Sequence, residues 1–210
     1  MKAAIFDLDG TLLDSMCFWE NVCFEYLKSK GIAAPDDLNV KIFSLTLHQA
    51  AQYVSKEFVP SLTAEEIIKE WDDYVMHAYE HSLSLKPSVY EYLSKLKKSD
   101  VRLCIATLTD KRHVIPALVR HRIFELFEFI ITVEEVNKNK HFPDIYLKAA
   151  EKLEVDIMDC VVFEDTLYAV KTARKAGFSV YGIYDMSSQV DRNEMASTCD
   201  RYIEDFGELL

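Results

Sequence analysis

A short apolar run that ends in two carboxylates sets the strongest constraint on how this chain can fold. The run AAIF leads directly into Asp7, Leu8, Asp9 and Gly10. Such a run is typical of a buried strand, and because side chains alternate along a strand, Asp7 and Asp9 are expected on the same side. Two carboxylates this close resist joint ionisation unless a cation joins them or one keeps its proton. The pair therefore indicates a cation or acid and base chemistry at a strand end, where open α/β sheets bind ligands.

The rest of the chain repeats the pattern of an apolar, β-rich run followed by a helix-length segment. Such runs are VRLCIAT from Val101, EFIITV from Glu128, CVVF from Cys160 and FSVYGIY from Phe178. Strands that alternate with helices predict a parallel sheet covered on both faces. The expected fold is therefore α/β, with a doubly wound, Rossmann-like sheet.

Residues 15–86 break this alternation, because they show helical spacing and no convincing strand. The apolar residues that recur at intervals near 3.6 are Ile67, Ile68, Trp71, Val75 and Tyr79. We expect a helical cap domain over 15–86, inserted into an α/β core that 1–14 and 87–210 form. Pro87 supports the second boundary, because proline favours the first turn of a helix.

The composition excludes several classes of partner. The chain has 210 residues, with 24 basic against 35 acidic ones, so its formal net charge is −11. This charge argues against nucleic acid or an anionic membrane as the main partner. No apolar run approaches the roughly 18 residues of a membrane span, and the first residues do not resemble a signal peptide. We expect a cytoplasmic protein, a monomer or weak homodimer, whose partner is a small molecule.

Two further strand ends carry polar residues that could meet a ligand. Thr107 stands at the end of one apolar run, where its hydroxyl and the backbone N–H of Leu108 could donate to a ligand oxygen. Glu164 and Asp165 follow another run, and carboxylate oxygens suit a hard cation such as Mg²⁺. Each residue also has a structural interpretation, since threonine favours strands and aspartate commonly caps helices.

A lysine before a predicted helix supplies a possible positive charge. Lys140 precedes Pro143 and Asp144, and proline is suited to the first turn of a helix. Lys138 is the neighbouring alternative. Either lysine could instead be a solvated residue of a charged loop.

Taken in order, these motifs resemble those of the haloacid dehalogenase-like (HAD) hydrolase superfamily, in its β-phosphoglucomutase-like branch with a helical cap. The matching residues are DLDGT from Asp7, Thr107, Lys140 with Pro143-Asp144, and Glu164-Asp165. Histidine follows the lysine here, where the family commonly has proline. The resemblance covers nearly the whole chain.

The resemblance implies a role for each motif. Asp7 would be the nucleophile that attacks phosphorus, and Asp9 the general acid and base. Thr107 and Lys140 would bind and polarise the phosphoryl group. The residues implied to contact substrate are Gly10, Trp19, Thr107, Leu108 and Lys140. The residues implied to hold Mg²⁺ are Asp7, Asp9, Glu164 and Asp165, with Asp165 the stronger choice for a direct ligand.

The expected activity is therefore Mg²⁺-dependent hydrolysis of a small phosphomonoester through an aspartyl-phosphate. Two alternatives stay open, a sugar phosphomutase and a catalytically idle binding or regulatory protein. The mutase is disfavoured because Trp19 stands where that branch has a histidine, and residues 42–48 contain no arginine. The idle protein is disfavoured because Asp7, Asp9, Lys140 and Asp165 are all retained. Trp19 could pack over a substrate or belong to the core of the cap.

Overall fold

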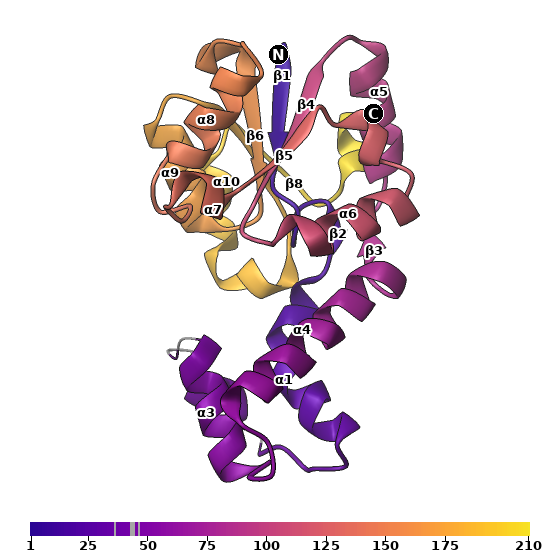
Figure 1. Cartoon of the computed structure of the whole chain (residues 1–210). Helices are drawn as coiled ribbons and strands as arrows, with labels where there is room; N and C mark the ends of the chain where they lie inside the picture. Colours follow the sequence, from indigo (N-terminus) through magenta and orange to yellow (C-terminus); the bar gives the residue numbers. More distant parts are fainter. Residues whose placement is uncertain (36, 43–44, 46) are drawn as a thin grey trace. The chain divides into compact units, whose positions relative to one another are not determined.

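The computed structural model describes residues 1–35, 37–42, 45 and 47–210 (Figure 1). The chain divides into two compact units, one formed by Met1–Met16 with Leu83–Leu210 and the other by Cys17–Ser82. These boundaries lie two residues later and four residues earlier than those expected from the sequence. Part of the 42–48 stretch considered above lies outside the described residues.

The first unit is built on a six-stranded parallel sheet in the order β5-β4-β1-β6-β7-β8. The strands are β1 (Ala3–Phe6), β4 (Arg102–Thr107), β5 (Phe129–Thr132), β6 (Cys160–Glu164), β7 (Ser179–Ile183) and β8 (Arg201–Ile203). The chain builds outward from β1 on one side and then returns to build on the other. The order therefore reverses between β1 and β6, and doubly wound sheets bind ligands at such a switch point.

Helices cover both faces of this sheet, which confirms the predicted α/β, Rossmann-like class (Figure 1). They are α5 (Val89–Lys98), α6 (Lys111–Arg120), α7 (Val133–Val136), α8 (Asp144–Lys152), α9 (Leu167–Lys175) and α10 (Arg192–Thr198), with 3-10 turns η1 (Phe124–Leu126), η2 (Ile157–Asp159), η3 (Met186–Asp191) and η4 (Phe206–Leu209). On one face Ile5, Cys104 and Val162 pack against α8 and α9. On the other face the ring of Phe6 stacks on that of Phe163, with centroids 4.3 Å apart. The central strands are buried on both faces, so β1 reads as a continuous apolar run.

A two-stranded antiparallel ribbon belongs to the same unit and was not predicted. It pairs β2 (Leu13–Asp14) with β3 (Ser84–Leu85). These strands have two residues each, which is too short for any periodicity to appear in the sequence. The ribbon therefore places side by side the two chain segments that lead into and out of the second unit.

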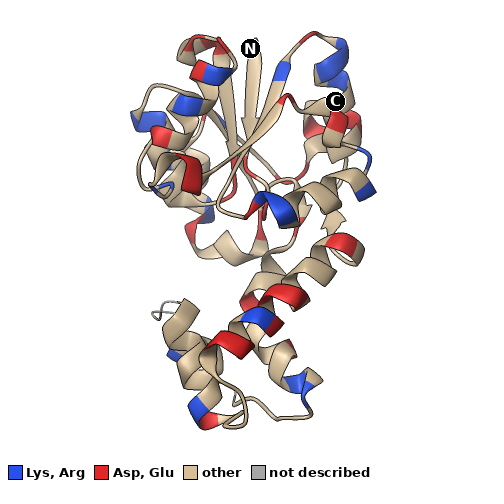
Figure 2. Cartoon of the chain, in the orientation of Figure 1, with Lys and Arg blue, Asp and Glu red and all other residues tan. Residues whose placement is uncertain are grey.

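The second unit is helical and has its own core. Its helices are α1 (Met16–Ser29), α2 (Leu38–Ile42), α3 (Leu47–Glu57) and α4 (Ala64–His81). Tyr26, Leu27, Val54, Ile67 and Trp71 are among its buried residues. The helix α4 starts with a capping box in which Thr63 and Glu66 satisfy each other's backbone N–H groups. Among the described residues, every helix is too short or too polar to cross a bilayer. Charged residues recur along α4, for example (Figure 2).

Candidate active site

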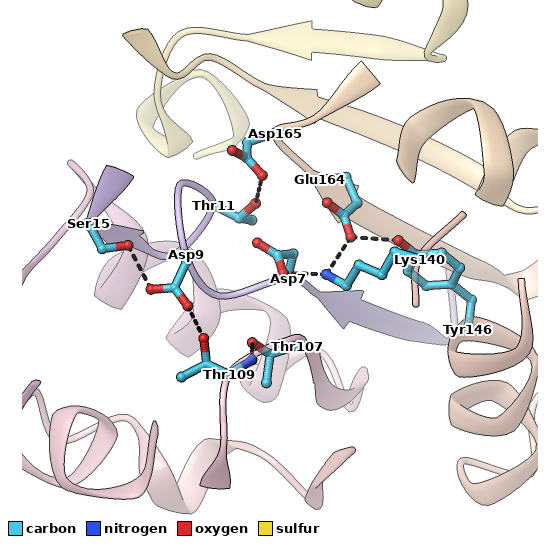
Figure 3. Close-up of polar contacts among 10 residues, drawn as sticks. All are labelled: Asp7, Asp9, Thr11, Ser15, Thr107, Thr109, Lys140, Tyr146, Glu164 and Asp165. Atoms are coloured by element: carbon cyan, nitrogen blue, oxygen red, sulfur yellow. Dashed lines mark hydrogen bonds and ion pairs between the residues drawn. The ribbon is translucent and has the colours of Figure 1, made fainter. Parts of the chain in front are cut away.

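The polar residues predicted at the ends of the central strands gather at the carboxyl edge of the sheet (Figure 3). Asp7 follows β1, and its N–H donates to the carbonyl oxygen of Phe163 at 2.9 Å. This bond sets Asp7 beside Glu164, which is the last residue of β6. Asp165 comes next, before α9 begins. Parallel pairing of β1 with β6 is therefore what brings the three carboxylates together.

Lys140 joins two of these carboxylates. Its Nζ donates to Asp7 Oδ1 and to Glu164 Oε1, the latter at 2.7 Å, and the lysine is only 2% exposed. Lys138 instead pairs with Asp144 at the surface, 2.7 Å away. The structure thus decides between the two candidate lysines, because Lys140 contacts the carboxylate cluster and Lys138 does not.

The cluster of Asp7, Glu164 and Asp165 has the composition of a metal site. One oxygen of each residue lies within 4.8 Å of the others. Asp165 Oδ1 lies 3.5 Å from Thr11 Oγ1, and its Oδ2 is buried with no hydrogen-bond partner among the described residues. With one ammonium among three carboxylates, two negative charges stay uncompensated if all are ionised. Buried charges need partners, and hard divalent cations prefer oxygen ligands, so these residues fit a divalent ion.

The main chain can pass this close to the Asp165 carboxylate only because Gly10 lacks a side chain. Its φ of +83° is in the left-handed region, and a Cβ there would lie 2.2 Å from Asp165 Oδ2. Glycine is therefore required at this position for two reasons: the turn needs a positive φ, and a side chain would collide with Asp165.

Burial and mutual repulsion shift the acidities in the cluster. Burial raises the pKa of Asp7 to about 7, Lys140 opposes this rise, and Glu164 adds to it. Burial also raises the pKa of Asp165 well above its usual range, and the charges of Asp7 and Glu164 raise it further. Burial alone would lower the pKa of Lys140, but the carboxylates of Asp7 and Glu164 raise it above the ordinary value. The cluster therefore needs more positive charge than Lys140 supplies.

Asp9 has a different environment from Asp7. Its Oδ1 accepts a bond from Ser15 Oγ and its Oδ2 accepts one from Thr109 Oγ1, both at 2.7 Å. Its carboxylate is not in the group formed by Asp7, Glu164 and Asp165. The alternation expected for a strand does not apply to this pair, because β1 ends at Phe6 and a turn closes on the Leu8 carbonyl.

The remaining predicted contacts are distributed over both units. Thr107 ends β4 and is buried, and its Oγ1 accepts the N–H of Thr109 at 3.0 Å. Leu108 is half exposed. Trp19 lies in the helical unit, where its Nε1 donates to Tyr79 Oη at 3.1 Å. This bond gives Trp19 a place in the packing of its own unit.

Sequence reasoning did not identify four side chains that contact the site. These are Thr11, Ser15, Thr109 and Tyr146. Thr11 is the last residue of the DLDGT motif, and Thr109 follows Thr107 by two residues. Their positions could therefore have identified both hydroxyls as site contacts. Ser15 and Tyr146 carried no such signal, since neither stood among the residues expected at the site.

Comparison with known proteins agrees with this geometry. A family model described as haloacid dehalogenase-like hydrolase matches residues 4–183. The chain is 27% identical to the phosphorylated carbohydrates phosphatase of Thermotoga maritima over 184 residues, which cover 87% of this chain and 85% of the relative. It is 29% identical to (DL)-glycerol-3-phosphatase 2 of Arabidopsis thaliana over 210 residues, which cover 96% and 87%.

Among solved structures, a putative beta-phosphoglucomutase from Thermotoga maritima superposes with a TM-score of 0.81. The match covers 97% of this chain and 94% of that one at 24% identity, so it shows a shared fold. Since the family model spans most of the sequence, including every strand-end motif of the site, the chain belongs to the haloacid dehalogenase-like hydrolases.

Proposed function

We propose that this protein is a phosphatase that hydrolyses a small phosphomonoester through a phosphorylated Asp7. The observation that carries the proposal is the contact of buried Lys140 with Asp7, beside an Asp165 oxygen that has no hydrogen-bond partner in the described part of the chain. The buried cluster thus combines a carboxylate that can act as nucleophile, a fixed ammonium group and a carboxylate oxygen that could bind a metal ion. This combination suits phosphoryl transfer, because catalysis of that reaction depends on positioning and charge.

The chemistry follows from two carboxylates in different surroundings. An oxygen of Asp7 attacks phosphorus, the bond from phosphorus to the leaving oxygen breaks, and Asp9 gives that oxygen its proton. Water then attacks the phosphorus of the aspartyl-phosphate, Asp9 takes a proton from it, and inorganic phosphate leaves with Asp7 restored. Lys140 offsets charge on the phosphoryl oxygens throughout. Mg²⁺ held by Asp7, Asp165 and Glu164 would add further positive charge at the same oxygens.

The hydroxyl partners of Asp9 suit an acid and base. Ser15 and Thr109 each present a hydroxyl that can donate or accept. When Asp9 is ionised both hydroxyls donate to it, and when it is protonated one of them can turn to accept. Asp9 can therefore gain or lose its proton while keeping both contacts.

The substrate class is supported by the relatives. Their names describe phosphatases of phosphorylated carbohydrates and of glycerol 3-phosphate. We infer that the substrate here is also a small phosphorylated metabolite. We further propose that the helical unit, residues 17–82, acts as a cap that selects among such substrates, since it folds around a core of its own.

A phosphate-release assay with Mg²⁺ tests the proposal. The panel contains para-nitrophenyl phosphate, sugar phosphates and glycerol phosphates, and the variant is Asp7→Asn. We expect release by the wild type and a loss of about a thousandfold or more in the variant, because the nucleophile is gone. Asp14→Asn, which alters an exposed carboxylate of the ribbon, is the matched control. Full activity in Asp7→Asn would refute the proposal, and isomerised sugar phosphate without free phosphate would identify a mutase.

A further inference from the structure

A buried tyrosine outside the sequence motifs reaches the centre of the site. Tyr146 lies in the first turn of α8, and its side chain is fully buried. Its ring meets Phe178 edge-on, with centroids 6.3 Å apart. Its hydroxyl donates to Glu164 Oε1 at 2.6 Å (Figure 3). The phenol is therefore fixed at its ring by the core and at its oxygen by the site.

Glu164 connects this hydroxyl to the lysine. The same Oε1 accepts from Tyr146 and from Lys140 Nζ, the latter at 2.7 Å. A glutamate side chain has several rotatable bonds, so one lysine contact alone would let the carboxylate turn with the lysine. The tyrosine supplies a second, rigid contact. Burial raises the pKa of Tyr146 well above its usual range, which keeps the hydroxyl a donor.

Lys140 in turn depends on Glu164 for its orientation. Its Nζ donates to Glu164 on one side and to Asp7 on the other. An ammonium on a flexible four-carbon stem acts as a point charge, so its effect on a phosphoryl group depends on where these partners hold it.

We propose that Tyr146 is a positioning residue for phosphoryl transfer, because its hydroxyl fixes Glu164 and Glu164 holds Lys140 against Asp7. This inference rests on the proposed phosphatase function. It assigns Tyr146 no contact with substrate. Removing the hydroxyl should therefore reduce turnover and leave substrate binding nearly intact.

The first test is Tyr146→Phe, assayed with para-nitrophenyl phosphate and Mg²⁺. We expect kcat to fall about tenfold, the scale seen when an outer hydrogen-bond partner of a site is removed, while KM stays within about twofold. Tyr92→Phe is the control, since Tyr92 is also buried, in α5, where its ring packs near Phe163 and Phe206. That control should keep the wild-type kcat.

A double-mutant cycle then tests the route through Glu164. If Tyr146 acts only through that carboxylate, adding Tyr146→Phe to Glu164→Ala should change kcat by no more than about twofold. Thermal unfolding is followed for every variant. If Tyr146→Phe is unfolded at the assay temperature, the cycle is measured at a lower temperature at which all of its variants are folded.

Three results would overturn the inference. Tyr146→Phe could keep the wild-type kcat while its Tm falls, which would make the hydroxyl purely structural. The losses of the two substitutions could multiply, which would show that Tyr146 acts independently of Glu164. A folded wild-type protein that releases no phosphate from any ester would refute the proposed function, and this inference would fall with it.

Discussion

At Lys140, one ammonium group is buried among carboxylates that outnumber it. Removing either partner of a buried ion pair leaves an uncompensated charge, which costs far more than losing an exposed pair. Lys140 therefore has two effects at once: it opposes the rise that burial causes in the pKa of Asp7, and it places positive charge where the phosphoryl group is transferred.

This double role predicts a large effect of Lys140→Met. We expect phosphate release to fall by about two orders of magnitude or more, because both the nucleophile and the transferring group lose their nearest fixed cation. Lys138→Met removes a lysine two positions away that pairs with Asp144 at the surface. It should keep activity within about twofold. Equal losses in the two variants, measured as kcat/KM, would contradict the assignment of Lys140.

The raised pKa values of Asp7 and Asp165 predict that Mg²⁺ stabilises the protein in a pH-dependent way. Without metal, the folded protein holds protons that the unfolded chain releases above about pH 4, so these groups make stability fall as pH rises toward about 7. A bound cation favours the ionised carboxylates and reverses this loss. We expect Mg²⁺ to raise the Tm more at pH 8 than at pH 5. Equal shifts at both values would contradict the metal site.

At the scale of elements, the turn after β1 combines a backbone requirement with a steric one. Gly10 and Gly31 both have positive φ, at +83° and +73°. A Cβ on Gly10 would collide with Asp165, whereas a Cβ on Gly31 would meet no atom within 4 Å. The two glycines therefore form a matched pair that separates strain from collision.

Alanine substitutions make this comparison. Gly31→Ala should cost about 1–2 kcal/mol of unfolding free energy from backbone strain and leave activity unchanged. Gly10→Ala should cost more and should raise the Mg²⁺ concentration needed for half-maximal activity, because the new methyl group displaces Asp165. Urea unfolding and Mg²⁺ titration of the activity measure the two effects. An unchanged Mg²⁺ requirement in Gly10→Ala would show that Asp165 is not a ligand.

The ribbon is anchored to the sheet by a second buried ion pair. Lys86 follows β3, its N–H donates to the Leu12 carbonyl at 2.9 Å, and its Nζ lies 2.8 Å from an oxygen of Asp185. Asp185 also accepts from the N–H and hydroxyl of Ser187. These contacts connect β3 to the segment that follows β7.

Asp185→Asn should therefore destabilise the protein by about 3 kcal/mol, because it leaves the buried Lys86 without a counter-charge. The exposed pair of Lys148 and Glu151 supplies the control, and Glu151→Gln should stay within about 0.5 kcal/mol of the wild type. Urea unfolding compares them. A loss below 1 kcal/mol in Asp185→Asn would mean that the pair does not anchor the ribbon.

For the whole molecule, the sequence predicts what depends on strand order and misses what depends on side-chain orientation. Short apolar runs separated by helix-length segments were sufficient for the α/β class, and residues at the ends of parallel strands had to meet at one edge. The ribbon was missed because two-residue strands carry no period. Ser15 and Tyr146 were missed because their contacts depend on the direction in which each side chain points, which spacing alone does not fix.

The two units also differ in what the sequence says about them. In α4, Ile67, Trp71, Val75 and Tyr79 are buried as their spacing indicates, and Ile68 is partly buried. The site role of Trp19 stays a prediction. In the sheet unit, by contrast, the charge and burial of each residue at a strand end predict a specific role, and each role can be tested by its own substitution.

The most direct measurement is chemical trapping of the phosphorylated enzyme. Asp9→Asn should slow hydrolysis of the aspartyl-phosphate more than its formation, because the base that activates water is lost whereas para-nitrophenolate is a stable anion that can leave without a proton. The intermediate should therefore accumulate during turnover of para-nitrophenyl phosphate with Mg²⁺. Borohydride reduces an acyl phosphate to an alcohol, and peptide mass spectrometry locates it. We predict homoserine in place of Asp7. Turnover with an unmodified Asp7, or with the label on another residue, would contradict the account.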